Sequence, residues 1–323
     1  MNLFVVCLCD SQHVDNGVRP FLPLAGFTER YFAPHRMVLS VVGIDHEAAV
    51  AAAAMHFGPS VFAASARAAP LGFRRPTCPF IGGDVRSAPD WTAQPASASA
   101  STAKREFTHM MLGFPTVGWA HDDVVPLCVV DTLLGGGSSF SAGGPGKGMY
   151  SRLYLEVLNR NGWVEAANAF SAQLYDSGVF GIYGAAPPEH AGALLETLTR
   201  QLVTLISRPV TMVELRRARN QLASSVMMNL ETRALLCEDI GRQVLNHGKR
   251  LDPTELLRRI QSVTPEDVQR VMLSTLEHPP ALAVVGEHDT MPTYAALQDF
   301  LQHHMNSHNR LKSAAPGSIH GRK

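Results

Sequence analysis

The stretch best suited to chemistry is Gly135–Gly148, which reads GGGSSFSAGGPGKG. Seven of its fourteen residues are glycine, so its backbone can adopt angles closed to other residues and approach a ligand closely. A phosphate-binding loop is the first candidate for such a run. That motif requires Ser or Thr after Gly146-Lys147, where Gly148 stands, and a glycine at the position of Ser141. The phosphate-binding reading therefore fails.

A dinucleotide-binding loop fails as well, because it must follow a strand and the residues before the glycines read as a helix. What remains is a flexible segment with rigid Pro145, apolar Phe140 and cationic Lys147. These features suit contact with an extended, variable peptide better than with a small rigid ligand. The competing interpretation is an inert low-complexity linker.

Two predicted helices flank the glycine-rich run and favour function over an inert linker. Val124–Leu134 is apolar, with Asp122 and Asp123 placed as N-caps. Tyr150–Leu158 repeats apolar residues on one face of an amphipathic helix. A loop held between two packed helices is more often functional than a spacer.

Histidine and cysteine residues predict no metal site. His46-Glu47 lacks a second histidine at the required spacing, and His304 and His308 have no glutamate between them. We therefore read these histidines as solvent-exposed, and Cys128, within an apolar helix, as a core residue rather than a nucleophile. The five cysteines are scattered and indicate reduced thiols: Cys7, Cys9, Cys78, Cys128 and Cys237.

Composition indicates a globular protein of one large or two medium domains. The chain has 323 residues, is 46% hydrophobic, and carries 28 basic and 28 acidic residues. This balance predicts no nucleic-acid partner. No apolar run approaches the ~20 residues that cross a bilayer. The N-terminal residues do not read as a targeting signal.

The remaining pattern alternates strands with capped helices. Capping boxes are expected at Thr211/Glu214 and at the helices that follow Asp252 and Thr264. Val38–Gly43 is also similar to Ala281–Gly286, which fits two copies of one α+β domain. The predicted strands are Met37–Val42, Phe80–Arg86, Phe107–Phe114, Trp163–Ser171, Val179–Ala185 and Ala281–Val285, and the other predicted helices are Ala48–Phe57 and Pro188–Ile206.

The residues from Leu133 to Tyr154 resemble the glycine-rich loop of the alpha subunits of mitochondrial processing peptidases, which belong to the pitrilysin-like peptidase family. Three further segments match in order: Tyr31–Val38, Met227–Glu231 and Glu238–Leu245. The resemblance covers about residues 25–58 and 79–300. It implies an α+β fold in which an antiparallel-rich sheet is covered by helices.

The resemblance also implies a domain plan and a truncated N-terminus. Residues 1–58 would be the end of a first peptidase-like domain, 59–78 a linker, and 79–301 a complete C-terminal copy. Within that copy, residues 87–104 would be a disordered insertion. Residues 302–323 would form a disordered tail.

For function, the resemblance implies a non-catalytic subunit that recognises presequences of imported precursors. Its partner would be a beta subunit that holds the zinc and cuts, so no cofactor is expected in this chain. The family's zinc motif, His-x-x-Glu-His, does not occur here. The expected location is the mitochondrial matrix, or the inner membrane through association with the bc1 complex.

The expected presequence contacts lie in the glycine-rich run and on one later helix. Glu238 and Asp239 could contact a cationic peptide, or could simply form a solvated or capping helix face. Met227 and Met228 are read as core residues. The candidate binding residues are Gly135, Gly136, Gly137, Ser138, Ser139, Phe140, Gly143, Gly144, Gly146, Lys147, Gly148, Glu238 and Asp239.

Two alternatives remain open. The chain could be a structural core protein of the respiratory bc1 complex, which shares the fold, although the long glycine-rich run counts against this. It could also belong to an independent zinc peptidase, which would need an upstream exon with an intact zinc motif.

Overall fold

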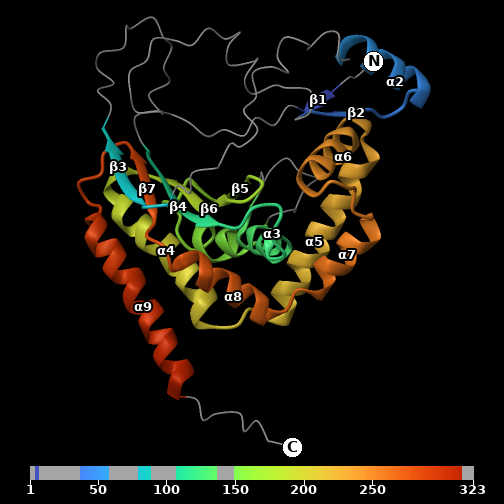
Figure 1. Ribbon diagram of the computed structural model, residues 1–323. Coiled ribbons are helices and arrows are strands. Elements are labelled where there is room, and N and C mark those ends of the chain that lie inside the picture. Colours follow the sequence, from blue (N-terminus) through green and yellow to red (C-terminus); the bar gives the residue numbers. More distant parts are fainter. Residues whose placement is uncertain (1–3, 7–36, 58–78, 89–106, 137–148, 315–323) are drawn as a thin grey trace, which may run out of the picture. The chain divides into compact units, whose positions relative to one another are not determined.

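The computed structural model describes residues 4–6, 37–57, 79–88, 107–136 and 149–314 (Figure 1). The chain divides into two compact units: unit 1 joins Met1–Cys78 with Val226–Pro253, and unit 2 joins Pro79–Ser225 with Thr254–Lys323. This division differs from the uninterrupted 79–301 domain predicted above. The linker over 59–78, most of the 87–104 insertion, and residues 137–148 lie outside the described residues.

Unit 2 is built on a five-stranded sheet of order β3-β7-β4-β6-β5. Only β3 and β7 run parallel, and the other neighbours are antiparallel. The predicted α+β fold with an antiparallel-rich sheet is therefore confirmed, and the strands fall where they were expected. Their bounds are β3 Gly83–Ser87, β4 Thr108–Thr116, β5 Ala166–Gln173, β6 Gly178–Ala186 and β7 Ala281–Val285.

One face of this sheet forms the core. Alternate side chains of β4 and β6 are fully buried, as period-two alternation requires: Met110, Leu112, Phe114, Phe180 and Ile182. Helices α3 (Val124–Leu134), α4 (Ala191–Ser207) and α8 (Pro265–Leu276) contact β5, β6 and β4 respectively on that face (Figure 1). The sheet is thus a one-sided layer under helices.

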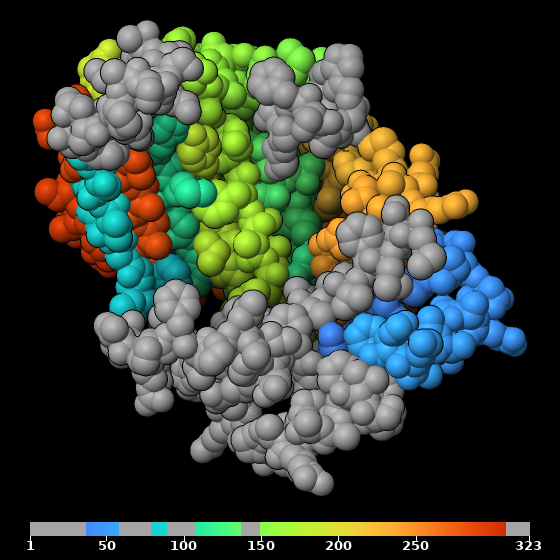
Figure 2. Space-filling view, turned by 90° about the horizontal axis from the view of Figure 1, so that it is seen from above, coloured from blue at the N-terminus to red at the C-terminus, as the bar shows by residue number. Residues whose placement is uncertain are grey.

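The opposite face of the sheet is turned toward the viewer in Figure 2, where atoms of β3 (cyan) and β7 (orange-red) lie at the surface. Val85, Met111, Val179 and Val285 share this face by strand register and are all at least 37% exposed. The same strands therefore alternate between a helix-covered face and an open one.

Two segments differ from their predicted helix bounds. The predicted Pro188–Ile206 helix is a 3-10 turn, η6 (Pro188–His190), followed by α4, which buries Leu194, Leu198, Leu202 and Leu205. The disordered tail predicted from residue 302 is wrong over 302–314, because α9 (Tyr294–Ala314) continues through it. Leu297, Leu301 and Met305 extend one buried face along that helix.

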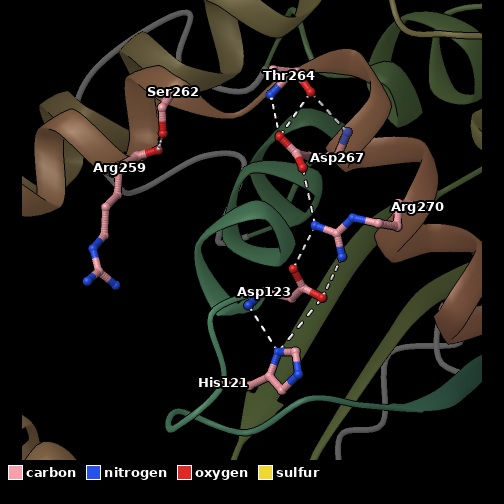
Figure 3. Close-up of polar contacts among 7 residues, drawn as sticks. All are labelled: His121, Asp123, Arg259, Ser262, Thr264, Asp267 and Arg270. Carbon is pink, nitrogen blue, oxygen red and sulfur yellow. Dashed lines mark hydrogen bonds and ion pairs between the residues drawn. The ribbon is translucent and has the colours of Figure 1, made fainter. Parts of the chain in front are cut away.

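The capping box is complete only at α8. Thr264 Oγ1 accepts from the Asp267 N–H at 3.1 Å, and Asp267 Oδ2 accepts from the Thr264 N–H at 2.9 Å (Figure 3). Before α5 (Met212–Glu231), Thr211 accepts from the Glu214 N–H, but the Glu214 carboxylate binds Arg152 instead of returning the bond.

At two further helix starts, a carboxylate near the predicted cap binds arginine, as Glu214 does. At α7 (Pro253–Ser262), the Glu255 carboxylate accepts from Arg258 and Arg259. At α3, Asp123 makes no side-chain cap and instead binds Arg270. Arginine forms stronger charge-assisted bonds than a backbone N–H does, and so it takes these carboxylates.

Unit 1 contains β1 (Phe4–Val6), β2 (Val38–Ser40), α2 (His46–Phe57) and α6 (Arg233–His247). Asp45 caps α2, accepting from the Ala48 N–H at 3.0 Å. Helix α6 packs on the antiparallel β1–β2 pair, and the Cys237 thiol donates to the Ser40 carbonyl at 3.0 Å. This packing groups residues 226–253 with the N-terminal residues. No helix among the described residues is long and apolar enough to cross a membrane.

The internal sequence similarity corresponds to a shared local conformation. Strands β2 and β7 both lead into a glycine with left-handed backbone, Gly43 at φ 91° and Gly286 at φ 128°. A residue with a side chain at this position would be strained. The two segments are therefore alike in structure as well as in sequence.

Neighbouring residues of β6 provide a test of the one-sided core. Replacing buried Phe180 with alanine should lower the free energy of unfolding by about 3–5 kcal/mol, through lost transfer energy and a cavity. Val179→Thr, on the open face, should change it by less than about 0.5 kcal/mol. Urea unfolding of the full chain measures both. Similar losses for the two variants would contradict the assignment of faces.

Candidate functional site

The entrance to the glycine-rich run is the C-terminus of α3. This helix is almost wholly apolar and buries seven of its eleven residues. Gly135 ends it in the left-handed conformation, φ 118°, and donates its N–H to the Asp131 carbonyl at 3.0 Å. Such a C-terminal cap favours glycine because a Cβ is strained there. The first residue of the predicted site thus has a defined structural role.

The exit from the run is anchored by three consecutive residues. Ser151 is buried and Leu153 is fully buried. Between them, Arg152 forms a bidentate ion pair with Glu214, with both contacts at 2.8 Å and both side chains largely buried. This geometry is the strong form of a carboxylate–guanidinium pair.

The predicted amphipathic helix over 150–158 is shorter and wider than expected. The structure has a π-helix, η5 (Tyr154–Leu158), and Val157 on it is buried as predicted. Tyr150 is 65% exposed rather than packed, and its ring lies under the guanidinium of Arg217. Short π-helical turns often accompany functional sites.

The two ends of the glycine-rich run meet. A Cβ placed on Gly135 would lie 2.8 Å from Ser151 Oγ, closer than real Cβ contacts allow. Gly135 and Ser151, which stand on the two sides of residues 137–148, are therefore side by side. Loops with adjacent ends are frequently functional. We call Gly135, Gly136 and Ser151 the stem.

Asp131 lies directly against the stem. A Cβ on Gly136 would collide with its carboxylate, so glycine is required there by close approach. The carboxylate accepts a hydrogen bond from the Ser171 hydroxyl of β5, but among the described residues nothing hydrogen-bonds to its Oδ1. Burial raises the pKa of Asp131 to about 6, and the Ser171 bond offsets only part of that rise.

The remaining glycine-rich candidates fall outside the described residues: Gly137, Ser138, Ser139, Phe140, Gly143, Gly144, Gly146, Lys147 and Gly148. Their role in binding stays a prediction. Across the described part of the chain, no three His, Cys, Asp or Glu side chains gather closely enough to hold a metal ion.

Glu238 and Asp239 lie on α6 of unit 1. Glu238 is exposed, whereas Asp239 accepts from Gln243 Nε2 at 2.7 Å. Gln243 in turn accepts from the Leu251 N–H at 2.7 Å, so Asp239 helps to hold the chain after α6. Asp239 therefore has a structural role. Contact with a cationic peptide stays a prediction for both Glu238 and Asp239. Met227 and Met228, predicted as core, are 44% and 37% exposed.

Sequence reasoning missed Asp131, Arg152 and Ser171. Asp131 left a signal, because it is the only charged residue in an otherwise apolar helix. The partners of Arg152 and Ser171 come from elements far along the chain, and no local pattern marks them.

Gly135→Ala tests the stem against a matched glycine. Gly248 caps α6 with φ 67°, but a Cβ there meets no atom within 4 Å. Gly248→Ala should destabilise the fold by about 1–2 kcal/mol from strain alone. Gly135→Ala should cost at least about 1 kcal/mol more, because it also strikes Ser151. The check is urea unfolding, with Ser151→Gly expected to restore part of the loss. Equal costs at the two glycines would contradict a closed stem.

Asp131 predicts a pH dependence of stability. Its folded pKa of about 6 exceeds the ordinary 3.8, so the folded state binds the proton more tightly. Ionisation therefore destabilises the fold progressively as pH rises from about 4 to above 6, by about 3 kcal/mol in total. Relative to Asp131→Asn, the natural chain should lose that stability over this range. Glu189→Gln, an exposed acid, serves as control. If the stability of the natural chain and of Asp131→Asn changed with pH in parallel, Asp131 would not be a buried carboxyl with a raised pKa.

Comparison with known proteins gives the family. The family model described as "Peptidase M16 inactive domain" matches residues 24–222. The human mitochondrial-processing peptidase subunit alpha is 38% identical over 278 residues, which cover 86% of this chain and 52% of that protein. The Neurospora crassa subunit alpha is 47% identical over 169 residues, covering 51% of this chain and 29% of that protein. The chain spans about half the length of the curated relatives in the first of these comparisons.

A solved structure shows the same fold at greater distance. A chain of complex III2 from Candida albicans, bound to Inz-5, superposes with a TM-score of 0.57 at 16% identity, covering 80% of this chain and 57% of that chain. The family model alone covers well over half of the sequence. The chain therefore belongs to the peptidase M16 family, and the curated relatives named above are alpha subunits of the mitochondrial processing peptidase.

Proposed function

We propose that this chain acts in mitochondria as the non-catalytic alpha subunit of a processing peptidase. The observation that carries the proposal is 38% identity to named alpha subunits over 86% of the chain. In this role it pairs with a beta subunit that holds the zinc and cuts the precursor. The absence of His-x-x-Glu-His from the printed sequence is consistent with a recognition role.

The glycine-rich run is the part that we assign to presequence recognition. Its closed stem supports this assignment, since Gly135 lies against Ser151 and Arg152 is locked to Glu214. A rigid base lets residues 137–148 present backbone groups to an extended peptide without loosening the fold. Glycine provides the close backbone approach that such contact needs.

The alternative, a core protein of the bc1 complex, rests on a structural similarity at 16% sequence identity. Such a similarity supports a shared fold and nothing further. Identity to alpha subunits is more than twice as high and extends over a similar share of the chain. These identities support the processing-peptidase role over the core-protein alternative, and we propose a location in the mitochondrial matrix or at the inner membrane.

Reconstitution tests the proposal. The full chain, a processing-peptidase beta subunit and a fluorescent presequence peptide are combined singly and together with zinc. Cleavage should require both subunits and stop with a chelator. Gly143→Ala/Gly144→Ala should weaken peptide binding to the pair, because the stiffened run adapts less well. Gly162→Ala, in a turn where a Cβ meets nothing within 4 Å, should leave binding unchanged.

Pairing is measured separately by size-exclusion chromatography, so that a loss of binding is not a loss of assembly. Chelator-sensitive cleavage by this chain alone would refute a non-catalytic role. Cleavage by the pair no faster than by the beta subunit alone, with pairing intact, would refute recognition. Equal affinity of the glycine variants and the natural pair would remove the run from the binding site.

A further inference from the structure

Exposed apolar side chains lie on two short segments of unit 2, one after the glycine-rich run and one at the start of α5. Met149 and Tyr150, the first described residues after the run, are 46% and 65% exposed. Met212 and Val213, in the first turn of α5, are 59% and 57% exposed. Single exposed apolar residues are common on proteins, but a contiguous group of them marks an interaction surface.

Side-chain contacts join the two segments into one surface. The Arg217 guanidinium of α5 lies over the Tyr150 ring, 5.6 Å from its centroid. Arg152 binds Glu214 through both carboxylate oxygens, each at 2.8 Å. Glu214 and Arg217 are three residues apart, so they are neighbours on the helix surface. The chain from Tyr150 to Arg152 is therefore held along the first two turns of α5.

The same helix face adds two positive charges. Met212 and Arg216, like Val213 and Arg217, are four residues apart and therefore lie one above the other on the helix. Both arginines are exposed, and neither forms an ion pair with a carboxylate of the described residues. We call this surface the α5 patch, and its residues are Met149, Tyr150, Met212, Val213, Arg216 and Arg217.

No nearby acid of α5 offsets the charge of the α5 patch. Glu214 is paired with Arg152, and the next acidic residue along the helix is Glu231. Arg216 and Arg217 therefore give the patch a formal charge of +2, one from each guanidinium. A surface of this charge attracts an acidic partner and disfavours a basic one.

The composition of the α5 patch fits a protein partner. Tyr, Met and Arg are enriched in protein–protein interfaces, whereas Lys and Glu are depleted there. An anionic membrane is recognised by clusters of about four to eight basic residues, and this patch has only its two arginines. Tyrosine and arginine beside exposed aliphatic side chains instead match the centre of a protein interface, where these two residue types contribute much of the binding energy.

We propose that the α5 patch docks the beta subunit of the processing peptidase, through a surface of that subunit that is apolar and acidic. The inference rests on the proposed function, which gives this chain such a partner. Position supports this occupant, because the patch begins at Met149, directly after the glycine-rich run ends at Gly148. A beta subunit seated on the patch lies beside the run, so a peptide held by the run is close to the subunit that cuts it.

The experiment measures the Kd of the pair formed by the full chain and a processing-peptidase beta subunit, by biolayer interferometry. Arg216→Glu/Arg217→Glu should weaken pairing at least about tenfold, because it sets acid against acid. Met212→Ala/Val213→Ala should weaken it by roughly three- to tenfold, through lost apolar contact. Lys249→Glu/Arg250→Glu makes the same charge reversal at two exposed residues of unit 1 and should leave the Kd unchanged.

Salt tests the electrostatic part of the docking. Added salt should weaken the natural pair, because it screens the attraction between the two arginines and the acidic partner surface. The pair formed by Arg216→Glu/Arg217→Glu should instead become tighter with salt, because a repulsion is screened. Circular dichroism and urea unfolding of each variant exclude misfolding as the cause of lost pairing.

The inference is wrong if Arg216→Glu/Arg217→Glu pairs as tightly as the natural chain, or if the unit 1 control loses as much affinity. It is also wrong if the α5 patch variants change only binding to vesicles of anionic phospholipid, or only self-association of this chain in size-exclusion chromatography. In each of these cases the natural pair still forms and cleaves, so the proposed function stands. A natural chain that does not pair with the beta subunit refutes both.

Discussion

The burial of α3 is the constraint on which both ends of the candidate site depend. Its seven buried side chains fix the helix against β5 and α8, and this fixes what lies at its two termini. At one end stands Gly135, locked against Ser151, and at the other Asp123, bound by Arg270. An apolar helix thus determines the separation of the glycine stem from the Asp123–Arg270 ion pair, and Asp131 is the only charged residue that it contributes near either. In enzymes and binding proteins, functional residues often lie on loops, and the packed helices or strands beside those loops hold them in position.

Asp131 is the only charged residue in this otherwise apolar helix. A carboxyl that is largely buried with one oxygen unpartnered is costly, and its raised pKa reflects the cost. The carboxyl touches Gly136 and Ser171, so it links the stem to the edge strand β5. Natural proteins keep such groups where local order matters more than stability.

Much of unit 2 was predictable because its signals are local. Period-two alternation located β4 and β6, and the Thr264–Asp267 box located α8 within a residue. The errors at the starts of α5 and α3 share one cause, since a carboxylate next to a helix start reads as a cap unless an arginine takes it. Glu214 and Asp123 are bound by Arg152 and Arg270, which lie 62 and 147 residues away along the chain. Of the site, the glycine-rich run was evident from composition, but the meeting of its ends at Ser151 depends on tertiary packing that no window of sequence contains.

The order of strands has a consequence for the sheet during synthesis. β7 is the last of the described strands along the chain, yet it lies between β3 and β4 and hydrogen-bonds to both. Residues 83–87 therefore leave the ribosome nearly two hundred residues before their only partner strand among the described residues, Ala281–Val285. Until then β3 has no place in the sheet, and β4 exposes an unpaired edge of the kind that invites aggregation. The sheet can close only after residues 281–285 have been made, so β3 and β4 wait unjoined over that interval.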